Sequence, residues 1–168
     1  MASRSSNSIG ETSLHTLLLT LNPVLHEPTY IFLTIPDSQF VAPSPFPLQH
    51  IQMFFREAKS VTLIIRHDVA LQNGLLPKFR DLENSEYDVQ YQYPCRMITC
   101  NVHSSLEAVG FMAHLATKLA ERGISVNPVS AYYHDHLFVP VKQAEEAVKI
   151  LEQVRHDAGG APADITTS

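Results

Sequence analysis

A short polar run is the first place where this chain could do chemistry. It contains His103, Ser104, Ser105, Leu106 and Glu107, and it stands between an apolar segment and an amphipathic one. Where a strand leads into a helix, the first helical amides are unpaired and lie at the positive end of the helix dipole, so they can receive a carboxylate. Ser104 and Glu107 also have the S-x-x-E spacing of a capping box. The sequence therefore predicts capping, and a compatible second hypothesis is that this turn binds a ligand.

A second group of reactive side chains is His134, Asp135 and His136, which lies where we expect a hairpin turn. Residues two apart in a strand share a face, so both imidazoles would lie together while Asp135 faces away. Together with His103, these side chains are the acid–base groups that a small enzyme could use. A metal site needs three or four convergent ligands, and His and Asp at a turn are more often ordinary turn residues. The sequence therefore predicts no metal site and leaves catalysis as an alternative.

The composition bounds the class of protein. The chain has 168 residues, of which 45% are hydrophobic and 17% charged, so it can bury the core of one ordinary domain or of two very small ones. Its formal net charge of -5 does not favour a nucleic-acid interface. No apolar run approaches the roughly 20 residues of a membrane span, and no glycine-rich phosphate loop is present. We therefore expect no nucleic-acid partner, no membrane association and no cofactor.

The two cysteines, Cys95 and Cys100, are five residues apart in what we interpret as a single strand. Their side chains would point to opposite faces and lie too far apart for a disulfide. Neither stands in a motif typical of a nucleophile. Reduced thiols are typical of an intracellular protein, and the start of the chain has no pattern of a secretory signal, so the expected location is the cytoplasm.

Hydrophobic periodicity predicts the elements that would position these groups. In the first half it predicts helices over residues 14–21, 48–55 and 69–72, strands over residues 29–35, 61–65 and 87–93, a proline-rich loop at 36–47 and a strand break at Pro94. In the second half it predicts strands over residues 96–102, 124–132 and 136–141, and a helix from the Ser104 cap to Arg122 that stops at Gly123. It also predicts a last helix with four inward-facing residues, Ala144, Ala147, Leu151 and Val154. Pro128 indicates that its strand lies at a sheet edge or is bulged. This mixture without strict βαβ repetition favours an α+β fold with mostly antiparallel sheets and helices on one face, in the ferredoxin-like style.

The second half resembles the ACT domain, a small regulatory ligand-binding module with a ferredoxin-like fold. The runs HSSLEAVG and YYHDHLFVPV carry the resemblance, and LNPVLHEPTYIFLTI and FREAKSVTLII are similar to the matching pieces of a first unit. The whole chain is similar to stand-alone proteins with two tandem ACT-like units. The implied organisation is a disordered tail over residues 1–11, ACT-like units over residues 12–94 and 95–155, and a disordered tail over residues 156–168. No closing strand follows the last helix, so the second unit must take that strand from elsewhere, for example from the first half.

The resemblance implies a regulatory protein that binds a small molecule, which we expect to be an amino acid, and that has no catalytic domain of its own. It places the ligand at the turn from His103 to Glu107 and at the start of the following strand, which comprises Ile124, Ser125, Val126 and Asn127. A regulated protein partner is expected, and so is a homo-oligomer, because ACT sheets often join edge to edge. One alternative is a small enzyme that acts on an amino-acid-derived metabolite through His103, His134, Asp135 and His136. Another is an assembly partner without a small ligand.

Overall fold

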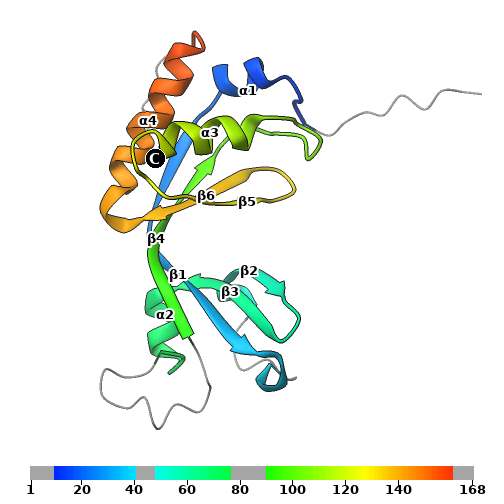
Figure 1. Cartoon of the computed structure of the whole chain (residues 1–168), viewed down its shortest axis with the longest axis vertical. Helices are drawn as coiled ribbons and strands as arrows, with labels where there is room; N and C mark the ends of the chain where they lie inside the picture. The colour runs from blue at the N-terminus through cyan, green and yellow to red at the C-terminus, as the bar shows by residue number, and fades with distance from the viewer. Residues whose placement is uncertain (1–9, 41–47, 77–89, 161–168) are drawn as a thin grey trace, which may run out of the picture. The chain divides into compact units, whose positions relative to one another are not determined.

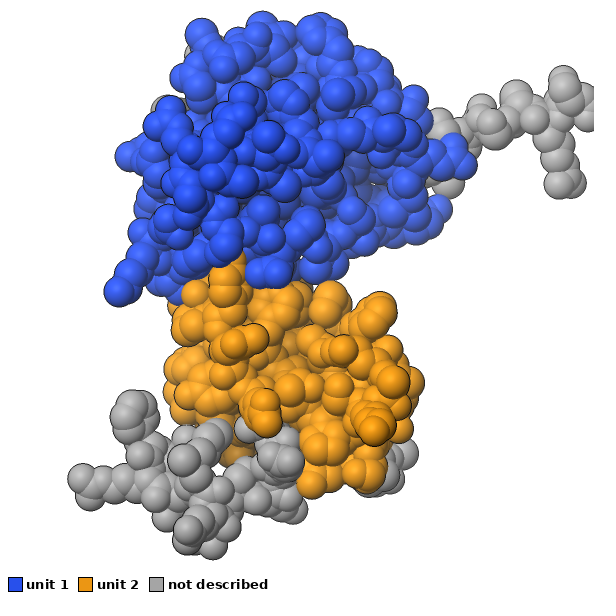
Figure 2. Space-filling model, viewed as in Figure 1, with its two compact units in different colours: residues 1–26, 97–168 blue, residues 27–96 orange. Residues whose placement is uncertain are grey.

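Two long strands, β1 (Pro23–Pro36) and β4 (Gln90–Cys100), contribute to both of the units into which the chain divides (Figure 1). The computed structural model describes residues 10–40, 48–76 and 90–160. The terminal unit comprises residues 1–26 and 97–168, and the internal unit comprises residues 27–96 (Figure 2). The compact units are therefore not two consecutive halves of the sequence.

The terminal unit takes its closing strand from the first part of the chain, as the sequence required. Its elements are α1 (Leu14–Leu19), α3 (Phe111–Ala120), β5 (Asn127–Ser130), β6 (Asp135–Pro140) and α4 (Ala144–Asp157), with a short 3-10 turn, η3, at Val141–Gln143. The strand order is β1-β4-β6-β5, to which β1 contributes residues 23–26. This order is ferredoxin-like, and it confirms the predicted α+β fold. The edge position predicted for the strand with Pro128 is also confirmed, since β5 ends the sheet.

The core of the terminal unit lies between one sheet face and the three helices α1, α3 and α4, which Figure 1 shows grouped together. Their apolar stripes supply Leu17, Leu115 and Leu151, all fully buried, which pack with Ile98 and Leu137 of the sheet. The inward residues predicted for the last helix are all buried: Ala144, Ala147, Leu151 and Val154. Helix α1 begins at Leu14, as predicted. Ser13 caps it, since its Oγ accepts a hydrogen bond from Thr16 N at 3.3 Å.

Within this unit, a hydrogen bond joins the end of α4 to the segment that follows α1. Arg155 is buried, and its Nη1 donates a hydrogen bond to Leu21 O at 3.3 Å. Helix α4 continues to Asp157, and Gly160 N donates to Arg155 O at 2.9 Å. The first residues of the segment expected to be a tail are thus part of the helix. Residues 1–9 and 161–168 of the two expected tails lie outside the described residues.

The internal unit also has a ferredoxin-like strand order, within the one six-stranded sheet, and it has its own core. Its further elements are two 3-10 turns, η1 (Asp37–Gln39) and η2 (Leu48–His50), the strands β2 (Ile51–Arg56) and β3 (Ser60–Arg66), and the helix α2 (His67–Gln72). The order is β2-β3-β1-β4, and β1 pairs with β3 in antiparallel register with Leu33 opposite Leu63. The predicted buried strand at residues 61–65 is confirmed, since these residues supply Val61, Leu63 and Ile65 to the core beside Val69 and Ala70 of α2.

The helix predicted over residues 48–55 is wrong, because only Leu48–His50 form a short 3-10 turn and the segment continues as the strand β2 from Ile51. Its apolar residues recur at helical spacing, but β2 pairs antiparallel with β3, with Phe54 opposite Leu63. The register shifts between Ile51 and Met53, so one extra residue is inserted into the strand. An insertion of this kind breaks the period of two that identifies a strand in sequence. Of the loop predicted over residues 36–47, Pro36 ends β1 and Asp37–Gln39 form η1, while residues 41–47 lie outside the described residues.

Pro94 does not end a strand, contrary to the prediction. Instead, β4 runs continuously from Gln90 to Cys100, and the irregularity is absorbed by Tyr93, whose φ is 61°. A positive φ is unusual for a bulky residue, and the Tyr93 ring contacts Phe32 edge to face at 5.9 Å between centroids. The prediction for residues 87–89 lies outside the described residues.

In the hairpin of β5 and β6, β5 is shorter than the strand predicted over residues 124–132, whereas β6 has the predicted length and begins one residue earlier. The turn of this hairpin covers residues 131–134, where Ala131 N donates to His134 O at 3.0 Å, so Asp135 belongs to the strand rather than to the turn. Ile124 precedes β5, and its amide donates to Leu119 O at 3.1 Å, closing the end of α3 after Gly123. Gly123 has a φ of 67°, so the predicted glycine stop is confirmed.

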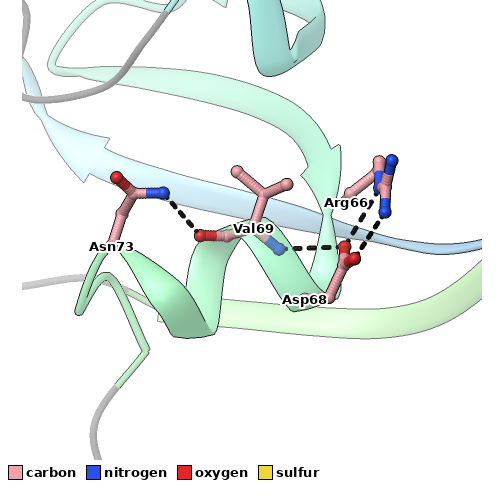
Figure 3. Close-up of polar contacts among 4 residues, drawn as sticks. All are labelled: Arg66, Asp68, Val69 and Asn73. Atoms are coloured by element: carbon pink, nitrogen blue, oxygen red, sulfur yellow. Dashed lines mark hydrogen bonds and ion pairs between the residues drawn. The ribbon is translucent and has the colours of Figure 1, made fainter.

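Helix α2 is held by polar contacts at both ends (Figure 3). The Arg66 guanidinium donates to both carboxylate oxygens of Asp68, at 3.0 and 2.5 Å, and the Val69 amide donates to Asp68 Oδ1 at 2.9 Å. At the other end, Asn73 Nδ2 donates to Val69 O at 2.8 Å. The hydrogen bonds from Arg66 lower the pKa of Asp68. This pair is exposed to solvent, so it fixes local geometry and adds little to stability.

The described helices include none that is long and apolar enough to cross a membrane.

We expect Leu17→Ala to lower the free energy of unfolding of the terminal unit by about 2–5 kcal/mol, because it leaves a cavity in a fully buried core. Since α1 belongs to this unit, amides in α4 should lose hydrogen-exchange protection. Urea unfolding followed by circular dichroism, combined with native-state exchange, measures both effects. The control is His15→Ala, an exposed position on the same helix. Protection in α4 that equals the parent value would contradict the assignment of α1 to this core.

Candidate functional site

The polar run from His103 to Glu107 is a loop, and the predicted capping box is wrong. Helix α3 begins at Phe111, and its N-cap is Gly110, which has a φ of 90° and provides no side-chain cap. Glu107 therefore lies before the helix instead of in its first turn. Ser105 Oγ accepts a hydrogen bond from Glu107 N at 3.2 Å, a local turn contact, and Ser104 turns away to a different partner.

That partner is Asp135, a carboxylate that is 6% exposed. Ser104 Oγ donates to Asp135 Oδ2 at 2.6 Å, and Ser130 Oγ donates to Asp135 Oδ1 at 2.5 Å. Ser130 ends β5 and stands opposite Asp135, the first residue of β6, so the hairpin register brings these two together. A buried carboxylate costs several kcal/mol unless hydrogen bonds compensate, and here each oxygen accepts one hydroxyl.

A cavity of about 220 Å³ opens beside this carboxylate, within the terminal unit. Its walls come from the loop, the first turn of α3 and the hairpin: Ser104, Ser105, Leu106, Ala108, Gly110, Phe111, Met112, Ala113, Ser130 and Asp135. The first intrahelical hydrogen bond of α3 runs from His114 N to Gly110 O, so the three preceding amides have no partner within the helix. The cavity thus combines hydrogen-bond donors at the positive end of a helix with a carboxylate and two hydroxyls.

The structure brings together only part of the predicted ligand site. Ser104, Ser105 and Leu106 line the cavity, whereas His103 lines a different one together with Gly10 and Glu11. The segment from Ile124 to Asn127 does not line the cavity, since Ile124 is buried in the core and Val126 packs against it. The sequence reasoning missed Ser130 and the first turn of α3. Ser130 could have been predicted from the hairpin, because pairing of the two strands places Ser130 opposite Asp135.

The four predicted acid–base groups are not assembled into one site. Asp135 lines the cavity, but His134 Nε2 is 3.2 Å from Asn101 Oδ1, and the His103 ring lies against Tyr133 at 5.4 Å between centroids. His136 lies on a different face of β6 from Asp135, as the alternation predicted. No group of three or more His, Cys, Asp or Glu side chains able to hold a metal ion occurs among residues 10–40, 48–76 and 90–160.

His136 instead belongs to a hydrogen-bonded chain of side chains on three neighbouring strands. Thr99 Oγ1 lies 2.8 Å from His26 Nε2 and 3.0 Å from His136 Nδ1. A hydroxyl has one proton, so it can donate to only one of the two imidazoles, and the other imidazole must donate to it. Burial lowers the pKa of both histidines, and the nearby His134 and His26 add to the effect on His136.

The two cysteines are free, as predicted, and both are buried. Burial raises the pKa of both thiols to about 12. A nucleophilic cysteine reacts as the thiolate, so these thiols are suited to packing rather than to chemistry.

Comparison with known proteins identifies the class. One model of the ACT domain matches residues 9–80, and a second model of the ACT domain matches residues 90–153. The chain therefore belongs to the ACT-domain family and contains two such domains in tandem. This membership supports a small-molecule-binding regulatory role. No curated protein sequence matches the chain significantly.

Among solved structures, the chain is similar to a protein of unknown function from Vibrio cholerae, described as a possible transport protein. The two are 33% identical with a TM-score of 0.63, over 86% of this chain and 97% of the other. The regulatory subunit of aspartate kinase from Thermus thermophilus, in its ligand-free form, has the same fold: 14% identity and a TM-score of 0.58, over 82% of this chain and 97% of that one. The corresponding subunit from Thermus flavus gives 13% identity and a TM-score of 0.56, over 79% and 95%.

We expect the stability of the protein to fall as the pH drops below 6.5, the ordinary pKa of histidine. The folded-state pKa values of His26 and His136 are lowered, so the unfolded chain binds protons first and is favoured. This contribution is complete above 6.5 and is lost as the pH falls toward the lowered folded values. In His136→Gln, urea unfolding between about pH 7.5 and about pH 5 should show a shallower loss.

The control for this titration is His15→Gln, which removes an exposed imidazole outside the hydrogen-bonded chain. Its pH dependence should match that of the parent. An equally steep loss of stability in His136→Gln would show that this network does not set the pH dependence.

Proposed function

We propose that this protein is a regulatory protein that binds a free amino acid in the cavity between the Ser104 loop, the start of α3 and Asp135. The observation that carries the proposal is the pairing, in one cavity, of helix-terminal amides with a buried carboxylate. A zwitterion needs donors at one end and an acceptor at the other. Its carboxylate suits the N-terminus of α3, where peptide dipoles favour negative charge.

The ammonium end suits Asp135. Each of its oxygens already accepts one hydroxyl, from Ser104 and from Ser130. An ionised carboxylate offers about four lone-pair sites, so about two remain for an ammonium group. A charge-assisted hydrogen bond in a site shielded from water is stronger than one between neutral groups. The two serines would hold the carboxylate in place while the ligand enters.

Size and charge narrow the ligand class. The cavity volume of about 220 Å³ lies below the range of roughly 300–1,000 Å³ usual for pockets that bind drug-sized ligands, so it suits a small ligand. Among the described residues that line the cavity there is no lysine or arginine, and the one charged side chain is an acid. This favours a zwitterion over a phosphorylated ligand, which would be repelled by Asp135 and would have no cation to pair with.

The similarity to the regulatory subunits of aspartate kinase supports a regulatory reading. We infer that the ligand signal passes to a protein partner. We also infer that the two tandem repeats of the sequence, as distinct from the compact units of the fold, extend over residues 12–94 and 95–155. The homo-oligomer expected from the sequence belongs to the same proposal. The enzyme alternative is not supported, since His103, His134 and His136 do not line the cavity that contains Asp135.

The proposal is tested by thermal shift and isothermal titration of the full chain against the twenty amino acids. A ligand at one hundred times its dissociation constant should stabilise the fold by about 2.7 kcal/mol. The methyl ester of the best binder lacks the carboxylate and its deaminated analogue lacks the ammonium, so both should bind more weakly. If no amino acid binds at millimolar concentration, the proposed ligand class is wrong.

Asp135→Asn should reduce the affinity for that amino acid about ten-fold or more, because a neutral amide replaces the carboxylate that faces the ammonium. The control is Asp157→Asn, which removes the same charge from the exposed end of α4. Isothermal titration of both variants measures the difference. Equal affinity in the two variants would contradict a role for Asp135 in binding.

A further inference from the structure

A short segment before α1 lies directly against the loop that carries Ser104. Glu11 N donates to His103 O at 2.9 Å, and Ser105 N donates to Glu11 O at 2.9 Å, so Glu11 and Ser104 form a parallel bridge. We call residues 10–13 the strap. The strap and the loop both belong to the terminal unit.

The close approach depends on the absence of a side chain at Gly10. A Cβ at this position would lie 2.7 Å from Ser105 N and 2.8 Å from the carbonyl carbon of Ser104. Both atoms are backbone atoms, so neither can move aside without moving the loop. Gly10 also has a φ of 109°, which other residues rarely adopt.

The strap is anchored at its other end to α1. Glu11 Oε1 accepts hydrogen bonds from Thr12 N at 2.8 Å and from Ser13 N at 2.7 Å, and Ser13 then caps the helix. Helix α1 is packed into the core through Leu17. The loop is therefore connected through two backbone hydrogen bonds to a rigid part of the unit.

The bridge fixes the residues on both sides of Ser104. Because His103 O and Ser105 N are both engaged by Glu11, the backbone of Ser104 has one orientation, and its hydroxyl meets Asp135 Oδ2 at 2.6 Å. Ser104 and Ser105 also line the cavity. A shift of the strap would thus move the donors on one wall of the cavity and release one oxygen of Asp135.

We propose that Gly10 and Glu11 are positioning residues for the ligand cavity, so that docking of the strap on the loop and binding of the ligand stabilise each other. This rests on the proposed function for the ligand itself, while the coupling of the strap to Ser104 and Asp135 is independent of it. Coupling between two sites is reciprocal, so the ligand should in turn hold the strap in place. Any event that draws the strap away would then lower ligand affinity.

The test compares Gly10→Val and the milder Gly10→Ala with Gly123→Ala in the full chain. Gly123 has a φ of 67° and no atom within 4 Å of the Cβ position, so it reproduces the backbone strain without a clash. The first readout needs no ligand. In the Gly10 variants the Ser105 amide should exchange faster and the side-chain carboxyl resonance of Asp135 should shift, while core amides of α4 stay protected.

The second readout is titration with the amino acid that stabilises the parent chain most. Affinity should fall about ten-fold in Gly10→Ala and further in Gly10→Val, and it should be unchanged in Gly123→Ala. If Gly10→Val does not fold, Gly10→Ala alone provides the test. Unchanged Ser105 exchange and an unchanged Asp135 resonance in the folded Gly10 variants would overturn the proposal, even if no amino acid binds the parent. Full affinity in a variant whose Ser105 amide has become exposed would also overturn it.

Discussion

The sheet of the terminal unit is complete only because residues 23–26 of β1 lie beside β4. A ferredoxin-like sheet needs a fourth strand, and among the described residues β1 supplies it. Once β1 takes this place, the helix that precedes it is drawn over the same core, where Leu17 and Leu21 are fully buried. The hydrogen bond from Asn101 N to Asn22 O, at 2.9 Å, joins this segment to the end of β4. The start of the chain therefore reaches the loop that lines the cavity.

The candidate site depends on the hydrogen bonds that this unit provides to one buried carboxyl group. Asp135 is kept at the start of β6 by two hydroxyl groups, one from the opposite strand of the hairpin and one from the loop after β4. Leaving either oxygen without a partner would cost about 1–3 kcal/mol, so the loop conformation and the hairpin are coupled. Such a carboxylate is also ready to accept an ammonium group. The feature that stabilises the loop is therefore the same feature that gives the cavity its chemistry.

The errors of the sequence reading have specific physical causes. Residues 48–55 have apolar residues at helical spacing, yet from Ile51 onward they form a strand, because pairing with β3 tolerates an inserted residue that hides the period of two. Pro94 should end a strand, but Tyr93 takes up a left-handed conformation and the strand continues. The spacing of Ser104 and Glu107 matched a capping box, although the helix begins later, at Phe111. The local sequence pattern gave the wrong prediction where a tertiary contact outweighed the local conformational preference.

Local sequence by itself determined the class of fold, the buried faces of α4 and β3, the edge position of β5, the free cysteines and the glycine that ends α3. These follow from hydrophobic periodicity and backbone sterics, which act over a few residues. It also pointed to Ser104 and Asp135, but as members of two separate groups. Only the tertiary structure decided that they share one cavity with Ser130 and the first turn of α3, and that Gly10 lies against the same loop. Hydrogen bonds between residues far apart in the chain leave no periodic trace in the sequence, because they depend on how the elements pack.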